Sequence, residues 1–412
     1  MASIAIVGAG LSGLRCATLL QASGHDVEVF DRAAIIGGRM RTDEVNGFLL
    51  DHGFHVMQTA YPTSQRAFDF KAMGALAFEP GAVLVQNKKN RSKFWTMADP
   101  FRRPFQGVMS GLNRFASPFD LFRVARMRFA VRRGKQADVF HGNNATTNEY
   151  LLNRGFSSAM IERFFHPLFS GIFLEDELRT NERMFRFVFR MMSEGDMVLP
   201  EGGIAAAPRQ LAQRLGDDRI HLNSAVTVID DTTVDIDGKL RTFDAVVQAF
   251  NPRQTKEKRH VWTLHFGATT SPLKTKHVLL NADVKINNGL IAHLAVPSDV
   301  QPTYAPAGKS LVTITVVGER ADALGLLDAE SVESAVRQEA SQWFVEASED
   351  WDLLATQHIE HALPEVGPEV TLLSDRRSTG FECGDHTLHG SVEGALRSAE
   401  SVAQAVDAHL RG

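Results

Sequence analysis

The chain has 412 residues, of which 44% are hydrophobic and 23% are charged, and this balance indicates a globular protein with room for two domains. The formal net charge of −5 argues against nucleic acid as a partner. No stretch reaches the roughly 18 consecutive apolar residues that span a membrane, and no secretory leader precedes the first strand, so we expect a cytoplasmic protein.

The first predicted element is a buried parallel strand over residues 4–7, followed at once by a glycine-rich turn and a helix. The three glycines of the turn have GxGxxG spacing. The first permits a tight turn, the second lets a pyrophosphate approach the backbone, and the third lets the helix pack on the strand. The phosphates of a dinucleotide would then lie on free N–H groups at the helix start. The residues expected to hold it are Gly8, Gly10, Leu11, Ser12 and Gly13.

A second strand, Asp26–Phe30, leads to the acid Asp31 with Arg32 beside it. A carboxylate at this distance from the glycines can accept hydrogen bonds from the adenosine ribose. The competing interpretation is a strand–turn–helix with no ligand, but the full fingerprint argues against it.

The next segment, Ile35–Met40, contains a diglycine followed by arginine. Two glycines permit a backbone turn against the ligand, and a guanidinium suits a pyrophosphate. We therefore expect cofactor contacts from Gly37, Gly38, Arg39 and Met40.

Residues Asp51–His55 read DHGFH, which suggests a turn near the reacting part of the cofactor. His52 and His55 are the candidate catalytic side chains, although histidines bonded only to the backbone are an equally good interpretation.

Residues 58–195 are predicted to be mostly helical. Within them, residues 91–135 contain eleven Lys or Arg, two Asp and eight Phe or Trp. Such a segment can lie on an anionic membrane surface, or it can be a solvated basic face over an ordinary core. The stretch 164–192 is rich in Phe and Met, which suits an apolar tunnel for a lipophilic substrate as well as a helix–helix core.

From residue 200 the pattern predicts a helix through Leu215, strand-like alternation over 220–229, a hairpin around Asp237-Gly238, and a buried strand over 245–250. Residues 256–360 predict a sheet with flanking helices, including one at about 329–346. Near the C-terminus, Gly384-Asp385 is followed by the helix start S-V-E-G-A at Ser391–Ala395.

Together these motifs resemble the flavoprotein group of amine oxidases, protoporphyrinogen oxidases and phytoene desaturases, and are most similar to the desaturases. The resemblance implies FAD as the cofactor, with no metal. It also implies that Val226 lies beside the adenine and that the C-terminal segment binds the ribityl, phosphate and flavin portions. These C-terminal residues are Gly384, Asp385, Ser391, Val392 and Ala395.

The implied fold class is α/β, a Rossmann-like FAD-binding domain of doubly wound type interleaved with an α+β substrate domain. The expected FAD-binding domain comprises residues 1–57, 196–255 and 361–412, and the substrate domain residues 58–195 and 256–360.

The expected function is oxidation or desaturation of a hydrophobic, isoprenoid- or polyene-like substrate by hydride transfer to flavin N5, with oxygen or a quinone as electron acceptor. Two alternatives stay open: a flavin amine oxidase using oxygen, and a redox-neutral flavin isomerase. Amine oxidases of the group carry a lysine at the flavin N5 edge, where the best alignment places Val261 here.

Overall fold

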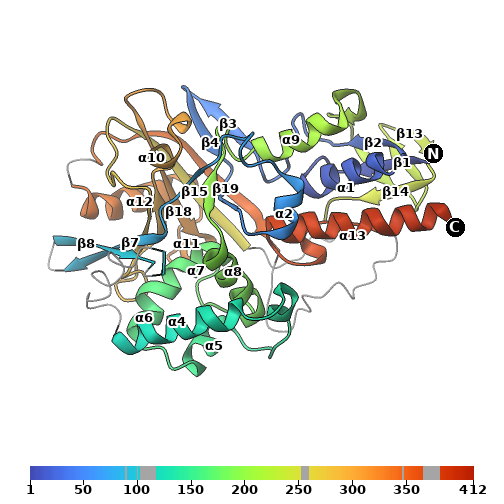
Figure 1. Cartoon of the computed structure of the whole chain (residues 1–412). Helices are drawn as coiled ribbons and strands as arrows, with labels where there is room; N and C mark the ends of the chain where they lie inside the picture. Colours follow the sequence, from blue (N-terminus) through green and yellow to red (C-terminus); the bar gives the residue numbers. More distant parts are fainter. Residues whose placement is uncertain (89–90, 100, 103–116, 252–258, 346–347, 365–380) are drawn as a thin grey trace.

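The computed structural model describes residues 1–88, 91–99, 101–102, 117–251, 259–345, 348–364 and 381–412. Figure 1 shows both chain ends at one side of the molecule, on a parallel sheet with its helices. A larger sheet lies at the opposite side, and a layer of helices lies beneath it.

A five-stranded parallel sheet brings together segments from the beginning, middle and end of the chain. Its strand order is β10-β2-β1-β14-β20, and every neighbouring pair is parallel. The strands are β1 (Ser3–Val7), β2 (Asp26–Phe30), β10 (Ile220–His221), β14 (Ala245–Gln248) and β20 (Phe381–Glu382). The buried apolar run of β1 is what a strand covered on both faces requires.

The two faces of this sheet are covered differently. Ile4 and Ile6 of β1 pack with the helices α1 (Leu11–Ala22), α9 (Ala206–Leu215) and α13 (Val392–Arg411). Ala5 and Val7 face a three-stranded antiparallel sheet instead. Its strands are β11 (Val226–Val228), β12 (Thr233–Ile236) and β13 (Lys239–Thr242). The expectation of a doubly wound sheet was therefore wrong on one face, although the α/β class is confirmed.

The region between β10 and β13 also differs in detail from the predicted continuous strand. The chain breaks between β10 and β11 at Asn223, which has a positive φ of 52°. The predicted hairpin does form, because Asp237 and Gly238 both adopt the positive φ that a tight two-residue turn needs.

The second sheet has seven strands in the order β19-β15-β18-β17-β16-β7-β8. Only β16 and β7 form a parallel pair; the other neighbours are antiparallel. The helix α12 (Ala329–Trp343) covers one face with an apolar core. The strands are β7 (Gly81–Lys88), β8 (Arg91–Ala98), β15 (Arg259–Ala268), β16 (Val278–Asn281), β17 (Ile291–Ala295), β18 (Ser310–Val317) and β19 (Asp352–Leu363).

The β7–β8 hairpin corrects the sequence interpretation of residues 58–195 as mostly helical. The hairpin extends the edge of the seven-stranded sheet by pairing with β16. β16 lies almost 200 residues away in the sequence, so a local pattern does not indicate this pairing, although β7 and β8 themselves are adjacent. Part of the basic segment 91–135, namely residues 100 and 103–116, lies outside the described residues.

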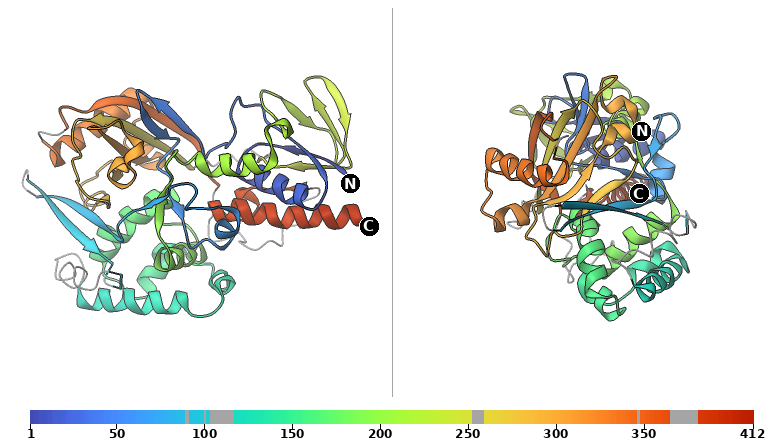
Figure 2. Two further views of the ribbon diagram at one scale, coloured as in Figure 1. Left: turned by 45° about the horizontal axis from the view of Figure 1, so that its top comes forward. Right: turned by 90° about the vertical axis from the view of Figure 1, so that its left-hand side faces the viewer.

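A further group of helices forms one layer around an aromatic core, which Figure 2 shows along the lower edge of the molecule in its left view. Its helices are α4 (Pro118–Arg132), α5 (Thr147–Asn153), α6 (Ser158–Met160), α7 (His166–Phe173) and α8 (Glu182–Glu194). The smaller helices and strands are α2 (Pro62–Ala67), β3 (Thr42–Val45), β4 (Phe48–Asp51), β5 (Met57–Gln58), β6 (Leu76–Ala77), β9 (Met197–Leu199), α10 (Pro297–Val300) and α11 (Gly318–Ala323). Among the described helices, none is both long and apolar enough to cross a bilayer.

Candidate functional site

The glycine-rich turn after β1 has the geometry that a dinucleotide needs. Gly8 has a φ of 117°, and a Cβ there would lie 2.9 Å from the carbonyl oxygen of Ala249. A Cβ on Gly13 would overlap the carbonyl oxygen of Gly8, so the helix can pack this closely only without a side chain. A Cβ on Gly10, by contrast, would meet no described atom within 4 Å.

The start of α1 offers donors toward this space. The first N–H groups of a helix have no partner within the helix, and Gly10 at the N-cap has no side chain that could accept from them. Leu11 and Ser12 form this first turn and are buried. An open cradle and free N–H groups at the positive end of a helix fit the pyrophosphate of FAD.

Asp31 lies at the end of β2, where the sequence placed it, but its two oxygens are engaged by the backbone. One accepts from the N–H of Ala9 at 2.7 Å and the other from the N–H of Ala33 at 2.8 Å. The carboxylate therefore stabilises the conformation of the glycine turn. Carboxylate oxygens have further lone pairs, so contact with a ribose stays a prediction.

Arg32 follows this acid, and the chain passes it again shortly before Val226. The N–H of Ser224 donates to the carbonyl oxygen of Asp31 at 2.9 Å, which carries the start of β11, and thus Val226, past the end of β2. Arg32 is exposed. The predicted adenine contact of Val226 is consistent with this placement and stays a prediction.

The diglycine segment folds directly onto the first glycine turn. The N–H of Gly37 donates to the carbonyl oxygen of Ala9 at 2.9 Å, and Gly37 and Gly38 have φ values of 107° and 59°. A Cβ on Gly38 would lie 3.5 Å from the Cα of Gly10. Met40 is buried in the core of the parallel sheet.

Arg39 joins this segment to the C-terminal motif. Its guanidinium donates to Asp385 at 2.5 Å and to the carbonyl oxygen of Ala362 at 2.7 Å. The Asp385 carboxylate raises the pKa of Arg39, which therefore stays charged. The predicted convergence of the two ends of the chain is thus present, and Arg39 shares its donors between this carboxylate and the backbone of Ala362, near the end of β19.

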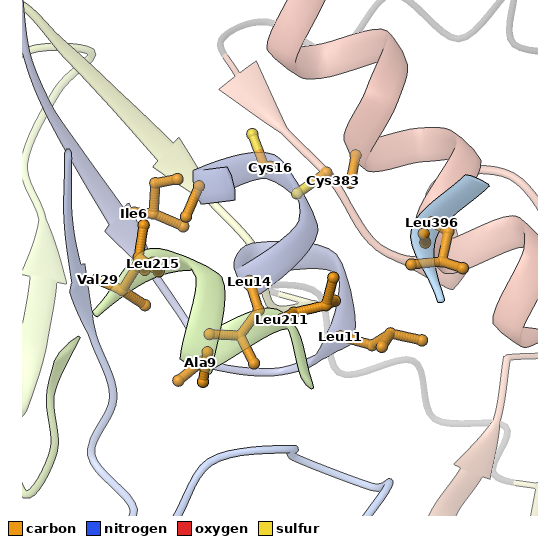
Figure 3. Close-up of a cluster of buried hydrophobic side chains, with 14 of the residues drawn as sticks. Ile6, Ala9, Leu11, Leu14, Cys16, Val29, Leu211, Leu215, Cys383 and Leu396 are labelled. Atoms are coloured by element: carbon orange, nitrogen blue, oxygen red, sulfur yellow. The ribbon is translucent and has the colours of Figure 1, made fainter. Parts of the chain in front are cut away.

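The C-terminal motif lies beside α1. The N–H of Cys383 donates to the carbonyl oxygen of Gln248 at 2.9 Å, and the buried thiols of Cys16 and Cys383 are neighbours in the core shown in Figure 3. Gly384 has a φ of 155° and donates its N–H to the Ser398 hydroxyl at 2.9 Å.

Helix α13 begins in the predicted way. The hydroxyl of Ser391 accepts from the N–H of Gly394 at 3.0 Å and caps the helix. Val392 and Ala395, in the first turn, are half-buried against the parallel-sheet core. The helix start therefore faces the region where the other motif residues converge.

The two candidate catalytic histidines have different environments. His52 contacts the Asp43 carboxylate at 2.5 Å and the Arg41 guanidinium, so it belongs to a surface-side charge cluster. The Nε2 of His55 lies 2.8 Å from the carbonyl oxygen of His52. Burial, with a smaller contribution from the Arg39 charge, lowers the pKa of His55 to about 4. His55 is therefore neutral at pH 7 and lies on the Arg39 side of the site.

The helical layer meets the start of α13 through residues that the sequence analysis did not assign to a site. His389 is buried between the rings of Phe140 and Phe187, with centroid distances of 5.6 and 5.3 Å. Burial lowers its pKa to about 4, and its Nε2 has no hydrogen-bond partner among the described residues. Tyr61 stacks on Phe187 at 5.6 Å and bonds to Ser391.

A buried acid also holds the start of α13 in position. Glu393, in the first turn of α13, accepts from the N–H of Thr63 at 2.9 Å and from its hydroxyl at 2.8 Å. This contact attaches α2 to α13 and fixes Tyr61 one residue before α2. The motif S-x-E-G-A contains the acid, but nothing in its sequence indicates Thr63 as the partner.

A second polar group ties β4 to the seven-stranded sheet. Asp51 accepts from Thr42 at 2.6 Å, from the N–H of Ile204 at 2.9 Å and from Tyr304 at 2.8 Å, and burial raises its pKa to about 6. His265 of β15 lies 3.1 Å from the carbonyl oxygen of Asp51. These contacts hold the His52–His55 turn against the sheet.

A family model described as "Flavin containing amine oxidoreductase" matches residues 11–407. Among curated proteins, 4,4'-diapophytoene desaturase of Staphylococcus haemolyticus is 46% identical over 50 residues, which cover 12% of this chain and 10% of that protein. Zeta-carotene desaturase of Solanum lycopersicum is 26% identical over 183 residues, which cover 40% of this chain and 30% of that protein. The matches thus span less than a third of either relative.

Among solved structures, an oxidoreductase from Methanosarcina mazei has a TM-score of 0.75 at 18% identity, covering 98% of this chain and 100% of that one. This likeness concerns the fold. The family match, by contrast, extends across nearly the whole sequence and describes flavin-containing proteins. The chain therefore belongs to the flavin-containing amine oxidoreductase family.

Proposed function

We propose that this protein oxidises or desaturates a hydrophobic, isoprenoid- or polyene-like substrate. When bound, FAD would accept a hydride from the substrate at N5, and oxygen or a quinone would then reoxidise it. The supporting observation is the environment of His389 at the start of α13. This neutral histidine is packed between two phenyl rings, which suits a hydrocarbon better than a charged substrate.

Desaturation also releases a proton from the carbon next to the one that loses hydride, so a base is needed. His55 is the better of the two sequence candidates. A carbonyl oxygen only accepts, so the Nε2 of His55 must donate to His52, and the Nδ1 then carries the lone pair. Its lowered pKa keeps that lone pair free at pH 7. His52 is held instead by Asp43 and Arg41.

Amine oxidation is the second candidate, and membership of the family supports it. The described β15 contains no lysine over residues 259–268, and the polar side chain it directs toward β4 is His265. This difference from the lysine expected at the flavin N5 edge favours the hydrocarbon substrate. A redox-neutral isomerisation is the third.

The test is anaerobic mixing of the yellow holoprotein with phytoene in detergent micelles, and separately with cyclohexylamine. The flavin absorbance near roughly 450 nm is followed. Bleaching by phytoene, with a product of longer conjugation, is expected. Bleaching by the amine alone would establish amine oxidation instead. Turnover of phytoene that needs prereduced flavin and causes no bleaching would establish isomerisation.

The proton acceptor is tested separately with His55→Gln. We expect the rate of flavin reduction by phytoene to fall about a hundredfold or more, with FAD still bound. His386→Gln is the matched control, because the Nε2 of His386 is already engaged by the Glu382 carboxylate at 2.8 Å. Equal rates in the two variants would remove His55 from this role and leave the substrate proposal standing.

A further inference from the structure

Three phenylalanines on α4 are exposed to solvent. Phe119, Phe122 and Phe129 have exposed fractions of 70%, 68% and 68%. Large aromatic side chains favour burial, and α4 has a conventional buried side, because Met127 and Val131 pack into the aromatic core of the helical layer. The exposed rings are thus additional to the residues that hold α4 in place.

The three rings share one side of the helix. At 3.6 residues per turn, positions 119, 122 and 129 fall within a narrow sector, and exposed Arg126 and Arg133 fall in the same sector. The rings extend over about 15 Å along the helix axis. In the left view of Figure 2, α4 runs along the outer edge of the helical layer, far from both chain ends.

The charge of this surface is opposite to that of the whole chain. The exposed positions between 118 and 135 carry three phenylalanines, three arginines and one lysine, and no acidic side chain. The acid within this stretch, Asp120, is buried and caps the helix with Ser117. The whole chain has a net charge of −5. This combination of aromatic rings and arginines is complementary to an apolar layer beneath anionic groups.

We propose that this face of α4 binds peripherally to a bilayer containing anionic lipid, with the three phenyl rings in the headgroup region and the arginines on lipid phosphates. A second copy of the chain is a poorer occupant. One face of a 15-residue helix is about 22 Å by 10 Å, well below the about 800 Å² per partner of a stable dimer. Two copies would also bring arginines together. The inference does not depend on the substrate.

The test is flotation of the FAD-loaded protein with vesicles of phosphatidylcholine alone or with one-third phosphatidylglycerol. Binding only to the anionic vesicles is expected, weakening as salt is raised. The triple variant F119S/F122S/F129S should bind at least tenfold more weakly. The matched control is I229S/L240S/L327S, which removes three other side chains that are 55%, 69% and 72% exposed. It should bind like the unmodified protein.

Two further measurements test the arginines and the phenyl rings separately. The pair R126E/R133E should also weaken binding at least tenfold while leaving the yellow colour and the circular dichroism unchanged. In F122W, the tryptophan emission should shift to shorter wavelength on adding anionic vesicles. Binding that the control variant loses equally, or no binding to anionic vesicles by the unmodified protein, would overturn the proposal. A dimer in size-exclusion chromatography that F119S/F122S/F129S dissociates would overturn it in favour of a second copy.

Discussion

Gly10 and Gly13 belong to one turn, but they are glycines for different reasons. The backbone of Gly10 is extended, with a φ of −76°, and a Cβ there would meet no described atom within 4 Å. At Gly13 a side chain would overlap the carbonyl oxygen of Gly8. Gly10 therefore leaves space for a ligand, whereas Gly13 lets helix α1 pack closely against the glycine turn.

This difference predicts opposite phenotypes. Gly10→Val should fold with a free energy of unfolding within about 1 kcal/mol of the flavin-free parent, but it should purify colourless because the branched side chain occupies the pyrophosphate space. Gly13→Val should lose several kcal/mol through overlap with the turn. Urea unfolding of the flavin-free proteins and flavin absorbance measure the two effects. A yellow, folded Gly10→Val protein would contradict the assignment of the cradle.

At the scale of elements, helix α4 depends on one buried carboxylate. Asp120 accepts from the hydroxyl of Ser117 at 2.7 Å, from the N–H of Ser157 at 3.0 Å and from the hydroxyl of Ser157 at 2.8 Å. Since Ser157 caps α6, the acid fixes the starts of two helices relative to each other. The capping pattern at Ser117 is local, but the partnership with Ser157 is not.

Asp120→Ala should therefore loosen the helical layer. Its removal leaves several buried donors unpaired, so we expect a loss of about 3 kcal/mol and faster amide exchange over residues 117–165 with little change in α13. Asp328→Ala removes an exposed cap of α12 and should cost only about 1 kcal/mol. Equal losses in the two variants would show that the buried acid has no special role.

The same distinction between local and distant partners explains what the sequence could predict. Gly8–Gly13, Asp31, Gly37–Arg39 and Ser391–Ala395 are local motifs, and the structure brings them together as expected. Tyr61 and His265 reach the site only through packing between elements far apart in the sequence, so no spacing identifies them. His389 lies two residues before Ser391, but its position between Phe140 and Phe187 depends on packing against the helical layer. The β7–β8 hairpin was missed although its two strands are neighbours in the sequence; only its pairing with β16 joins distant parts of the chain.

At the scale of the whole molecule, four histidines with a lowered pKa oppose folding in acid. Burial is the main cause that lowers the pKa of each to about 4: His55, His265, His293 and His389. In the unfolded chain their pKa is about 6.5. Between these values the unfolded state binds more protons, so the free energy of unfolding falls as the pH falls. Asp51, whose pKa is raised to about 6, has the opposite effect between about 4 and 6.

Urea unfolding should accordingly give a lower free energy of unfolding at pH 5 than at pH 7. Each histidine contributes up to about 1.4 kcal/mol per pH unit. The variant His293→Gln keeps a donor toward the carbonyl oxygens of Pro167 and Leu168 but does not titrate. Its pH dependence should be shallower by one such contribution. A flat profile between pH 7 and 5 would contradict the neutral state of these residues.

The pairing of β14 with β20 and the hydrogen bond from Arg39 to Asp385 also determine when the cofactor site can form during biosynthesis. The glycine turn leaves the ribosome early, whereas residues 381–395 emerge hundreds of codons later. During most of translation, the growing polypeptide therefore contains only the N-terminal part of the cofactor site, and it gains the C-terminal part near the end. Chains translated through α13 should therefore bind flavin, whereas prematurely terminated chains should lack the yellow colour of bound flavin.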